Sequence, residues 1–209
     1  AVLAQAQDRL QTNDYFRLRS VGAVQWSPDG TRIAHSITHH DGTGKPYSQL
    51  WLLEVATGKS ARVGDAESRG SQPCWAPDGR SLAYIGTVSG KSGLILGRAD
   101  GSAPTWITEV RTTNSSALTN TARTLSWSPD SKTLAYVSAT PGPETADASG
   151  DPMVITRFLY KPTYSEGNTR FNDNRRLHIF VLDVASGRTH QLTDGVYDVP
   201  DHEDLLASL

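Results

Sequence analysis

One short pattern recurs three times along the chain and constrains its fold more than any other feature. The pattern reads "QWSPDG" at Gln25–Gly30, "CWAPDG" at Cys74–Gly79 and "SWSPDS" at Ser126–Ser131. The period of about 50 residues lies in the range in which solenoids and propellers are found. The chain is therefore expected to repeat one small structural unit.

Each copy places a tight turn directly after an aromatic residue. Pro presets φ at the second position of the turn, Asp accepts hydrogen bonds from nearby backbone, and Gly tolerates positive φ. A strand-like segment follows at once, as "TRIAHS", "RSLAYIG" or "KTLAYVS". The small Ala in each segment is expected to let neighbouring sheets pack closely. His35, Tyr84 and Tyr136 occupy equivalent positions, which favours a packing role for all three.

A second hairpin follows the first in each unit. Its two strands are separated by a turn with Gly near its end, at Thr57-Gly58, Asp100-Gly101 and Ser186-Gly187. Two hairpins per unit make four antiparallel strands, which is the content of one β-propeller blade. The sequence thus predicts an all-β fold, a partial β-propeller of about three four-stranded blades plus the start of a fourth, with a short N-terminal helix.

The repeat also predicts where the parts of the chain begin and end. The expected parts are a signal-peptide remnant and N-terminal helix at 1–21, an incomplete propeller at 22–209, and blades at about 22–64, 71–108 and 123–193. A long insertion, 139–176, interrupts the third blade. Its Pro- and Gly-rich start indicates a loop, "MVITRFLY" has strand character, and "KPTYSEGNTRFNDNRR" is expected to be a loop again.

Three blades are too few to close a propeller. A blade buries its faces only against its neighbours, and propellers typically have about four to eight blades. An arc of three blades would leave two apolar sheet faces in contact with water. We therefore expect the chain to be part of a longer protein, or to complete its ring with a second chain.

Composition and charge narrow the choice of partners and compartment. The formal net charge of -2 and the pI of about 6.3 give no basic excess, so no nucleic-acid partner is expected. No apolar run approaches the ~18 residues of a membrane span. The single cysteine, Cys74, excludes an internal disulfide and is interpreted as a small buried apolar group. Ala4-Gln5-Ala6 resembles a signal-peptidase site, which favours a periplasmic or secreted protein over a cytoplasmic one.

No residue of the chain has the pattern of a catalytic group, and no cofactor or metal is expected. The nearest approach to a Gly-x-Ser-x-Gly nucleophile motif is Gly86–Gly90, in which Ser stands one place late. His39-His40-Asp41 lacks further ligands at a suitable spacing and indicates a loop. Arg175 and Arg176 are the candidate substrate contacts, because at a central cavity they would bind a peptide carboxylate in a bidentate manner. Solvated or interdomain charges are the alternative for both.

Longer stretches resemble a known family. The opening "DYFRLRSVGAVQWSPDG", the pair "TRFLYK" and "RRLHIFVLDVASGRTHQLTDGVYD", and the insertion itself are similar to the N-terminal β-propellers of the prolyl oligopeptidase family of serine peptidases. The acylaminoacyl-peptidase and dipeptidyl-peptidase-like branch is the most similar. Lys161–Tyr164 and Ser131 depart from the family pattern. An adjacent Glu-Glu pair is missing, so dipeptidyl-peptidase specificity does not carry over.

The resemblance implies a two-domain enzyme. In this family the propeller caps an α/β-hydrolase domain that holds the Ser-Asp-His triad, and it restricts access to short or unfolded peptides. By this reading the chain alone is not catalytic, and its partners are a peptide substrate and the hydrolase domain or remaining blades. Two alternatives stay open: a Tol-type protein-interaction propeller without catalysis, and a propeller fused to another enzyme domain such as an amidohydrolase.

Overall fold

The computed structural model describes residues 11–42, 44–112, 124–141, 160–162, 169–171 and 175–195. Three four-stranded antiparallel sheets account for nearly all of this part of the chain. Blade one consists of β1 (Arg19–Trp26), β2 (Arg32–His39), β3 (Tyr47–Glu54) and β4 (Ser60–Arg62). Blade two consists of β5 (Arg69–Trp75), β6 (Ser81–Val88), β7 (Lys91–Arg98) and β8 (Thr105–Thr108). Blade three consists of β9 (Leu125–Trp127), β10 (Thr133–Pro141), β13 (Arg175–Asp183) and β14 (Arg188–Gln191).

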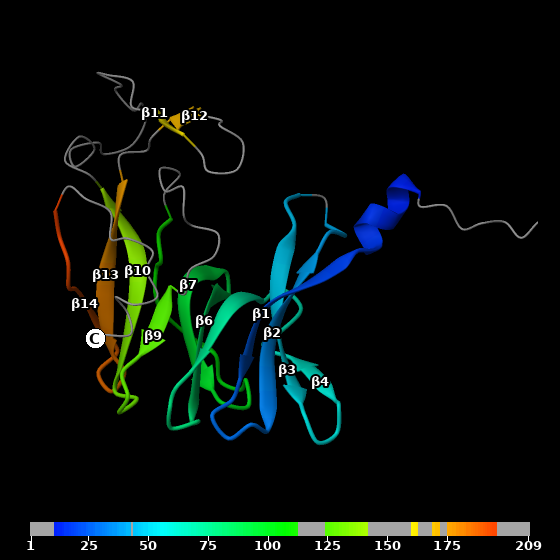
Figure 1. The fold of residues 1–209 in the computed structure, drawn as a ribbon, viewed down its shortest axis with the longest axis horizontal. Helices are drawn as coiled ribbons and strands as arrows, with labels where there is room; N and C mark the ends of the chain where they lie inside the picture. Colours follow the sequence, from blue (N-terminus) through cyan, green and yellow to red (C-terminus); the bar gives the residue numbers. More distant parts are fainter. Residues whose placement is uncertain are drawn as a thin grey trace, which may run out of the picture.

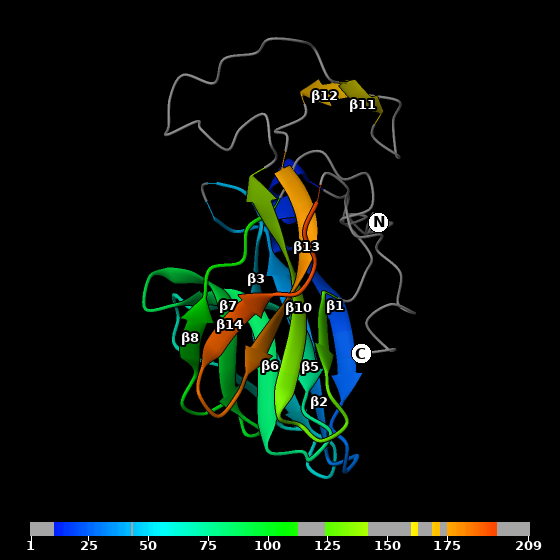
Figure 2. The same cartoon turned by 90° about the vertical axis from the view of Figure 1, so that its left-hand side faces the viewer.

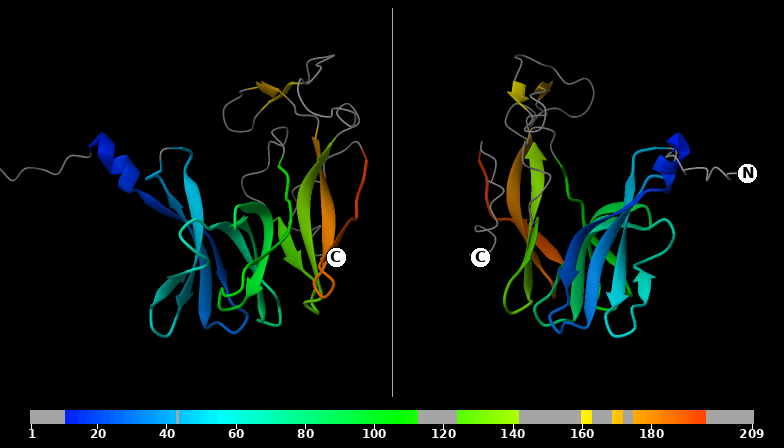
Figure 3. Two further views of the ribbon diagram at one scale, coloured as in Figure 1. Left: turned by 180° about the vertical axis from the view of Figure 1, so that it is seen from behind. Right: turned by 45° about the vertical axis from the view of Figure 1, so that its right-hand side comes forward.

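The three sheets stand side by side like the blades of an open fan (Figure 1). The same order, blade one to blade three, is seen from behind and obliquely in Figure 3. Strand order follows the chain within each blade except for the insertion between β10 and β13. The predicted all-β partial propeller is therefore confirmed, while the expected start of a fourth blade and the signal-peptide remnant lie outside the described residues.

The repeated turns form as their sequence predicts. In the first two copies Gly30 and Gly79 both adopt φ of 69°, and Ser131 takes the same left-handed place in the third with φ of 60°. The backbone N–H of Gly30 donates to the carbonyl of Ser27 at 2.9 Å, which closes the four-residue turn. The hairpin glycines Gly58 and Gly187 are also left-handed, with φ of 66° and 68°.

Each blade has two faces, which we call forward and backward. The forward face points toward the next blade along the chain, and the backward face points toward the preceding blade. Between blades one and two lies a buried cluster of Ala34, Leu50, Leu52, Val63, Trp75, Leu82, Tyr84 and Ile95. Between blades two and three lies a second cluster of Ala83, Leu94, Leu125, Leu134, Tyr136 and Leu182. Burial of each large apolar side chain contributes about 1.5–3 kcal/mol, so these clusters hold the fan together.

The repeated Ala and aromatic positions have the packing roles that the sequence predicts. Ala34 and Ala83 are fully buried on forward faces, where a side chain larger than a methyl group would push the next blade away. Tyr84 and Tyr136 are buried on backward faces, whereas His35, the equivalent residue of blade one, is half-buried.

The insertion begins later than its Pro- and Gly-rich sequence indicates. β10 continues through Pro141, which pairs with Arg175, so the ladder closes before the chain leaves the sheet. Within the insertion, β11 (Tyr160–Pro162) pairs antiparallel with β12 (Thr169–Phe171). The prediction that this second half is a plain loop is therefore wrong, because a short hairpin forms there. The Pro- and Gly-rich first half, 142–159, lies outside the described residues.

The two ends of the blades differ in what they carry. The hairpin β11–β12 and the N-terminal helix lie at one end, which we call the upper end (Figure 2). The Ser-Pro-Asp-Gly turns lie at the opposite, lower end. The helix, η1 (Thr12–Arg17), is a 3-10 helix that precedes β1 directly. Asp14 Oδ2 accepts a hydrogen bond from the Gln11 backbone at 2.8 Å, and Gln11 is the N-cap residue.

Candidate functional site

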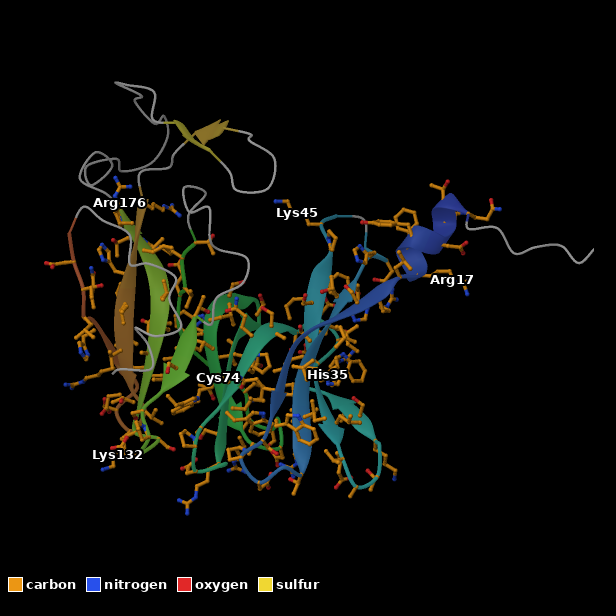
Figure 4. The ribbon with its side chains drawn as sticks, viewed as in Figure 1. Arg17, His35, Lys45, Cys74, Lys132 and Arg176 are labelled. Atoms are coloured by element: carbon orange, nitrogen blue, oxygen red, sulfur yellow. The ribbon has the colours of Figure 1, made fainter. Side chains whose placement is uncertain are left out.

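Arg175 and Arg176 lie at the upper end of blade three, where β13 begins (Figure 4). Arg175 is exposed, and its Nη1 donates to the carbonyl of Thr112 at 3.2 Å. Arg176 Nη1 donates to the carbonyl of Arg175 at 3.3 Å. The Arg175 guanidinium thus contacts the segment that leads out of blade two. Substrate binding by the two arginines stays a prediction.

A cavity of about 310 Å³ lies next to these arginines, between blades two and three. Segment 109–112 runs along the top of β10, because the backbone of Ala139 donates to the Arg111 carbonyl at 2.8 Å. The Arg111 backbone donates in turn to Ser138 Oγ at 3.0 Å. These bonds hold Glu109 and Arg111, themselves paired at 3.2 Å, at the rim of the cavity.

The floor of this cavity is aromatic. Tyr136 and Phe180 stack with ring centroids 5.4 Å apart, and both line the cavity together with Thr108 and Thr189. Burial raises the pKa of Tyr136, while hydrogen bonds to Thr189 and Thr108 oppose that rise. The cavity therefore combines an aromatic floor with a charged rim. No sequence pattern predicts this cavity, because Glu109 and Arg111 come from a connection that carries no motif.

A second polar cluster lies at the upper end of blade one. Asp41 accepts from Arg19 Nη2 at 2.5 Å and from the Tyr47 hydroxyl at 2.9 Å. His39 stacks on Tyr47 with ring centroids 5.0 Å apart, and Arg69 lies 4.0 Å over the same ring. Burial is the main cause that lowers the pKa of His39, and hydrogen bonding from Tyr47 is the main cause that lowers the pKa of Asp41.

This cluster anchors η1 rather than forming a metal site. Arg19 Nη1 donates to the carbonyls of Phe16 and Leu18, and the Tyr15 hydroxyl lies 3.1 Å from His40 Nδ1. In the part of the chain that the structure describes, no group of three metal-ligating side chains is close enough to hold an ion. The interpretation of residues 39–41 as a plain loop missed this role, since His39 ends β2.

No catalytic set is found among the described residues. Ser89 and Gly90, the nearest match to a nucleophile motif, form the two-residue turn between β6 and β7 with φ of 51° and 75°. Cys74 is half-buried between blades two and three, and its Sγ lies 3.7 Å from the Leu125 carbonyl. The described helix, η1, is too short and polar to cross a membrane.

Comparisons with known proteins agree with the fold. The chain is 26% identical over 200 residues to an uncharacterised peptidase, YuxL, of Bacillus subtilis (strain 168), covering 92% of this chain and 29% of that protein. The acylaminoacyl peptidase of Pyrococcus horikoshii superimposes with a TM-score of 0.61 at 13% identity, covering 86% of this chain and 25% of its own. An acylaminoacyl peptidase in complex with Z-Gly-Gly-Phe-chloromethyl ketone superimposes with a TM-score of 0.58 at 14% identity, over 85% and 25% of the two chains. No protein-family model matches the chain.

The fold and these comparisons show that the chain is part of a β-propeller. Within that class, the chain is similar to the propellers of peptidases in the prolyl oligopeptidase family, as its motifs predict. It spans less than a third of the length of each of these three relatives.

Proposed function

We propose that the chain is the N-terminal propeller portion of a serine peptidase of the prolyl oligopeptidase family. In this proposal it limits the access of short peptides to an α/β-hydrolase domain elsewhere in the same protein. The observation that carries the proposal is a three-blade fan related in sequence to a peptidase of which it spans 29%. A periplasmic or secreted location remains a prediction that rests on Ala4-Gln5-Ala6.

The upper end of the blades is the end that we assign to substrate entry. Arg175, Arg176, the cavity above Tyr136 and the hairpin β11–β12 all lie there. The lower end consists of tight turns, of which those of blades two and three are joined by the bond from the Asp78 backbone to Ser131 Oγ at 3.0 Å. The cavity and the two arginines therefore favour passage of peptides through the upper end.

A serine-reactive probe tests the class of enzyme. The full-length protein is expected to be labelled and to hydrolyse short peptides faster than folded proteins. Absence of labelling above background, together with stable binding of a protein ligand, would instead favour the Tol-type alternative. Labelling should vanish after denaturation, which controls for nonspecific acylation.

Substrate contact by the arginines has its own test. Replacing both, Arg175→Ala with Arg176→Ala, is expected to raise KM about 10- to 100-fold for a peptide with a free carboxylate, because hydrogen bonds to charged groups contribute about 1.5–3 kcal/mol. The amidated form of the same peptide should show no such increase. Lys132→Ala, at the lower end of the same blade, is the matched control. An equal rise in KM for the amidated peptide would mean that neither arginine binds the carboxylate.

A further inference from the structure

Blades two and three each insert a tryptophan into the blade before them. Trp75 is 7% exposed and packs with Ala34 and Leu52 on the forward face of blade one. Trp127 packs with the forward face of blade two, where its Nε1 donates to the carbonyl of Cys74 at 3.0 Å. In both cases the tryptophan ends the first strand of its blade, which we call the inner strand, directly before the repeated turn.

The receiving positions form one row across each sheet. In blade two the row is Cys74, Ala83 and Leu96, which are register partners on β5, β6 and β7. A partner row of the same kind crosses blade three. Its members are Ser126, Ala135 and Val181 on β9, β10 and β13. The forward face of blade three thus repeats the seat that Trp127 occupies on blade two.

A cavity lies at this row on blade three. It measures about 160 Å³ and is lined by Ser126, Ala135 and Val181, with Thr133 and Leu192 at its rim. Cavities of about 150 Å³ admit one benzene ring, so the space can hold an aromatic ring. Leu192, which also lines this cavity, is 47% exposed.

We propose that this cavity receives the tryptophan side chain of a following blade of the same protein. The donor is the end of an inner strand, because both internal examples insert the last residue of an inner strand. The interface is a continuation of the two that the chain already forms. The inference rests on the fold and not on peptidase activity, so it holds for any protein that completes this ring.

Trp26 shows the other half of the same arrangement. It pairs with Ile33 as Trp75 pairs with Leu82, yet it is 59% exposed, because no described strand lies on the backward face of blade one. A blade that precedes blade one in the closed ring would offer Trp26 a seat like that of Trp75.

Hydroxyl-radical footprinting of the full-length protein with mass spectrometry tests the proposal without a variant. Leu192 and Val55 are matched probes, with exposed fractions of 47% and 44% in this chain. If a following blade covers the cavity, Leu192 is oxidised several-fold more slowly than Val55; if the ring also closes onto blade one, Trp26 is protected like Trp75. Equal oxidation of Leu192 and Val55 overturns the proposal.

Three substitutions provide an independent reading. Ala83→Leu fills the seat that Trp127 already occupies and serves as the positive control, while Ala185→Leu adds the same bulk at an exposed turn of blade three. Ala135→Leu is expected to lower the urea midpoint as much as Ala83→Leu does. If Ala135→Leu instead behaves like Ala185→Leu, no tryptophan occupies the cavity. Should Ala135→Leu prevent folding altogether, the footprint of the unaltered protein still decides.

A second copy of the protein is the main competing occupant. In that case the protection of Leu192 falls as the protein is diluted, and the mass in solution falls with it. Such dilution dependence overturns the assignment to the same polypeptide. Labelling by the serine-reactive probe is a separate measurement, so failure of the ring inference and failure of the proposed function are distinguishable.

Discussion

At the scale of single residues, Ser131 shows how a departure from the repeat is compensated. It occupies a left-handed position that Gly fills in the other two copies, which is unfavourable for a residue with a Cβ by roughly 1–2 kcal/mol. In return its Oγ accepts the backbone N–H of Asp78 in the neighbouring blade at 3.0 Å. The hydroxyl therefore joins the lower turns of blades two and three.

Substitution of Ser131 separates these two effects. Ser131→Ala keeps the left-handed backbone and loses the bond, so unfolding free energy should fall by about 1 kcal/mol. Ser131→Gly also loses the bond, but it removes the Cβ that makes the left-handed conformation unfavourable. This gain in stability should exceed the loss, because the Asp78 N–H is exposed and can bond to water. Urea unfolding should therefore rank Ser131→Gly at or above the unaltered protein. A rank below Ser131→Ala would contradict this account.

Tyr84 and Tyr136 differ in a way that burial alone does not reveal. The Tyr84 hydroxyl is buried with no hydrogen-bond partner among the described residues, and burial raises its pKa to about 12. Tyr136 bonds to Thr189 and Thr108. Tyr84→Phe is therefore expected to stabilise the fold or leave it unchanged, whereas Tyr136→Phe should destabilise it by about 1 kcal/mol. Thermal unfolding of the two variants checks this, and equal losses would count against it.

At the scale of elements, the repeated turn is built around its carboxylate. Asp29 Oδ1 accepts from the Ser27 hydroxyl at 2.6 Å and from the Thr31 backbone at 3.0 Å. Ser128 and Asp130 repeat the arrangement at 2.7 Å in blade three, whereas Ala76 removes the hydroxyl in blade two. The Ser27 bond is the main cause that lowers the pKa of Asp29 from 3.8 to about 2.

This shift predicts a pH dependence with a definite sign. Because folding lowers the pKa of Asp29, its carboxylate stabilises the folded state above pH 3.8, and that stabilisation is lost as pH falls toward 2. Asp29→Asn should lower stability at pH 7 and remove part of the slope between those values. Urea titrations from pH 7 to pH 2 measure the difference, which should shrink on acidification. A constant difference at every pH would show that the charge of Asp29 is not involved.

At the scale of the whole molecule, the spacing between blades one and two depends on a glycine, Gly70, which has no Cβ. A Cβ on Gly70 would lie 2.8 Å from the Leu50 Cβ, across the interface of blades one and two, and 3.1 Å from the Tyr84 ring within blade two. The inner strand of blade two therefore approaches blade one as closely as its backbone permits. Packing at this density leaves little room to adjust.

Gly70→Ala should separate the two blades. We expect a loss of about 1–3 kcal/mol in unfolding free energy, as for other overpacked sites. Gly44→Ala is the control, because its Cβ would meet nothing within 4 Å. Denaturant unfolding of both variants gives the comparison. If Gly70→Ala loses no more unfolding free energy than the control, the interface adjusts to the added methyl group.

The repeat by itself determined the architecture. The tryptophan and the turn after it define a strand end and a strand start, because Pro, Asp and Gly restrict the backbone locally. The alternation of Ala with Leu and Tyr assigned opposite faces, since side chains alternate across a strand. Local preferences of this kind can be recognised from the sequence alone, and so blade number and packing roles were predictable.

Only the tertiary structure decided what lies between the blades. The cavity above Tyr136 and the seat at Ala135 are formed by residues far apart in the chain, which no local pattern joins. The inner strands also bulge at Ala23 and Gln72, both with positive φ, although neither residue type signals it. Such features arise where one sheet meets another, because contacts of large sequence separation, and not backbone preference, set the geometry there.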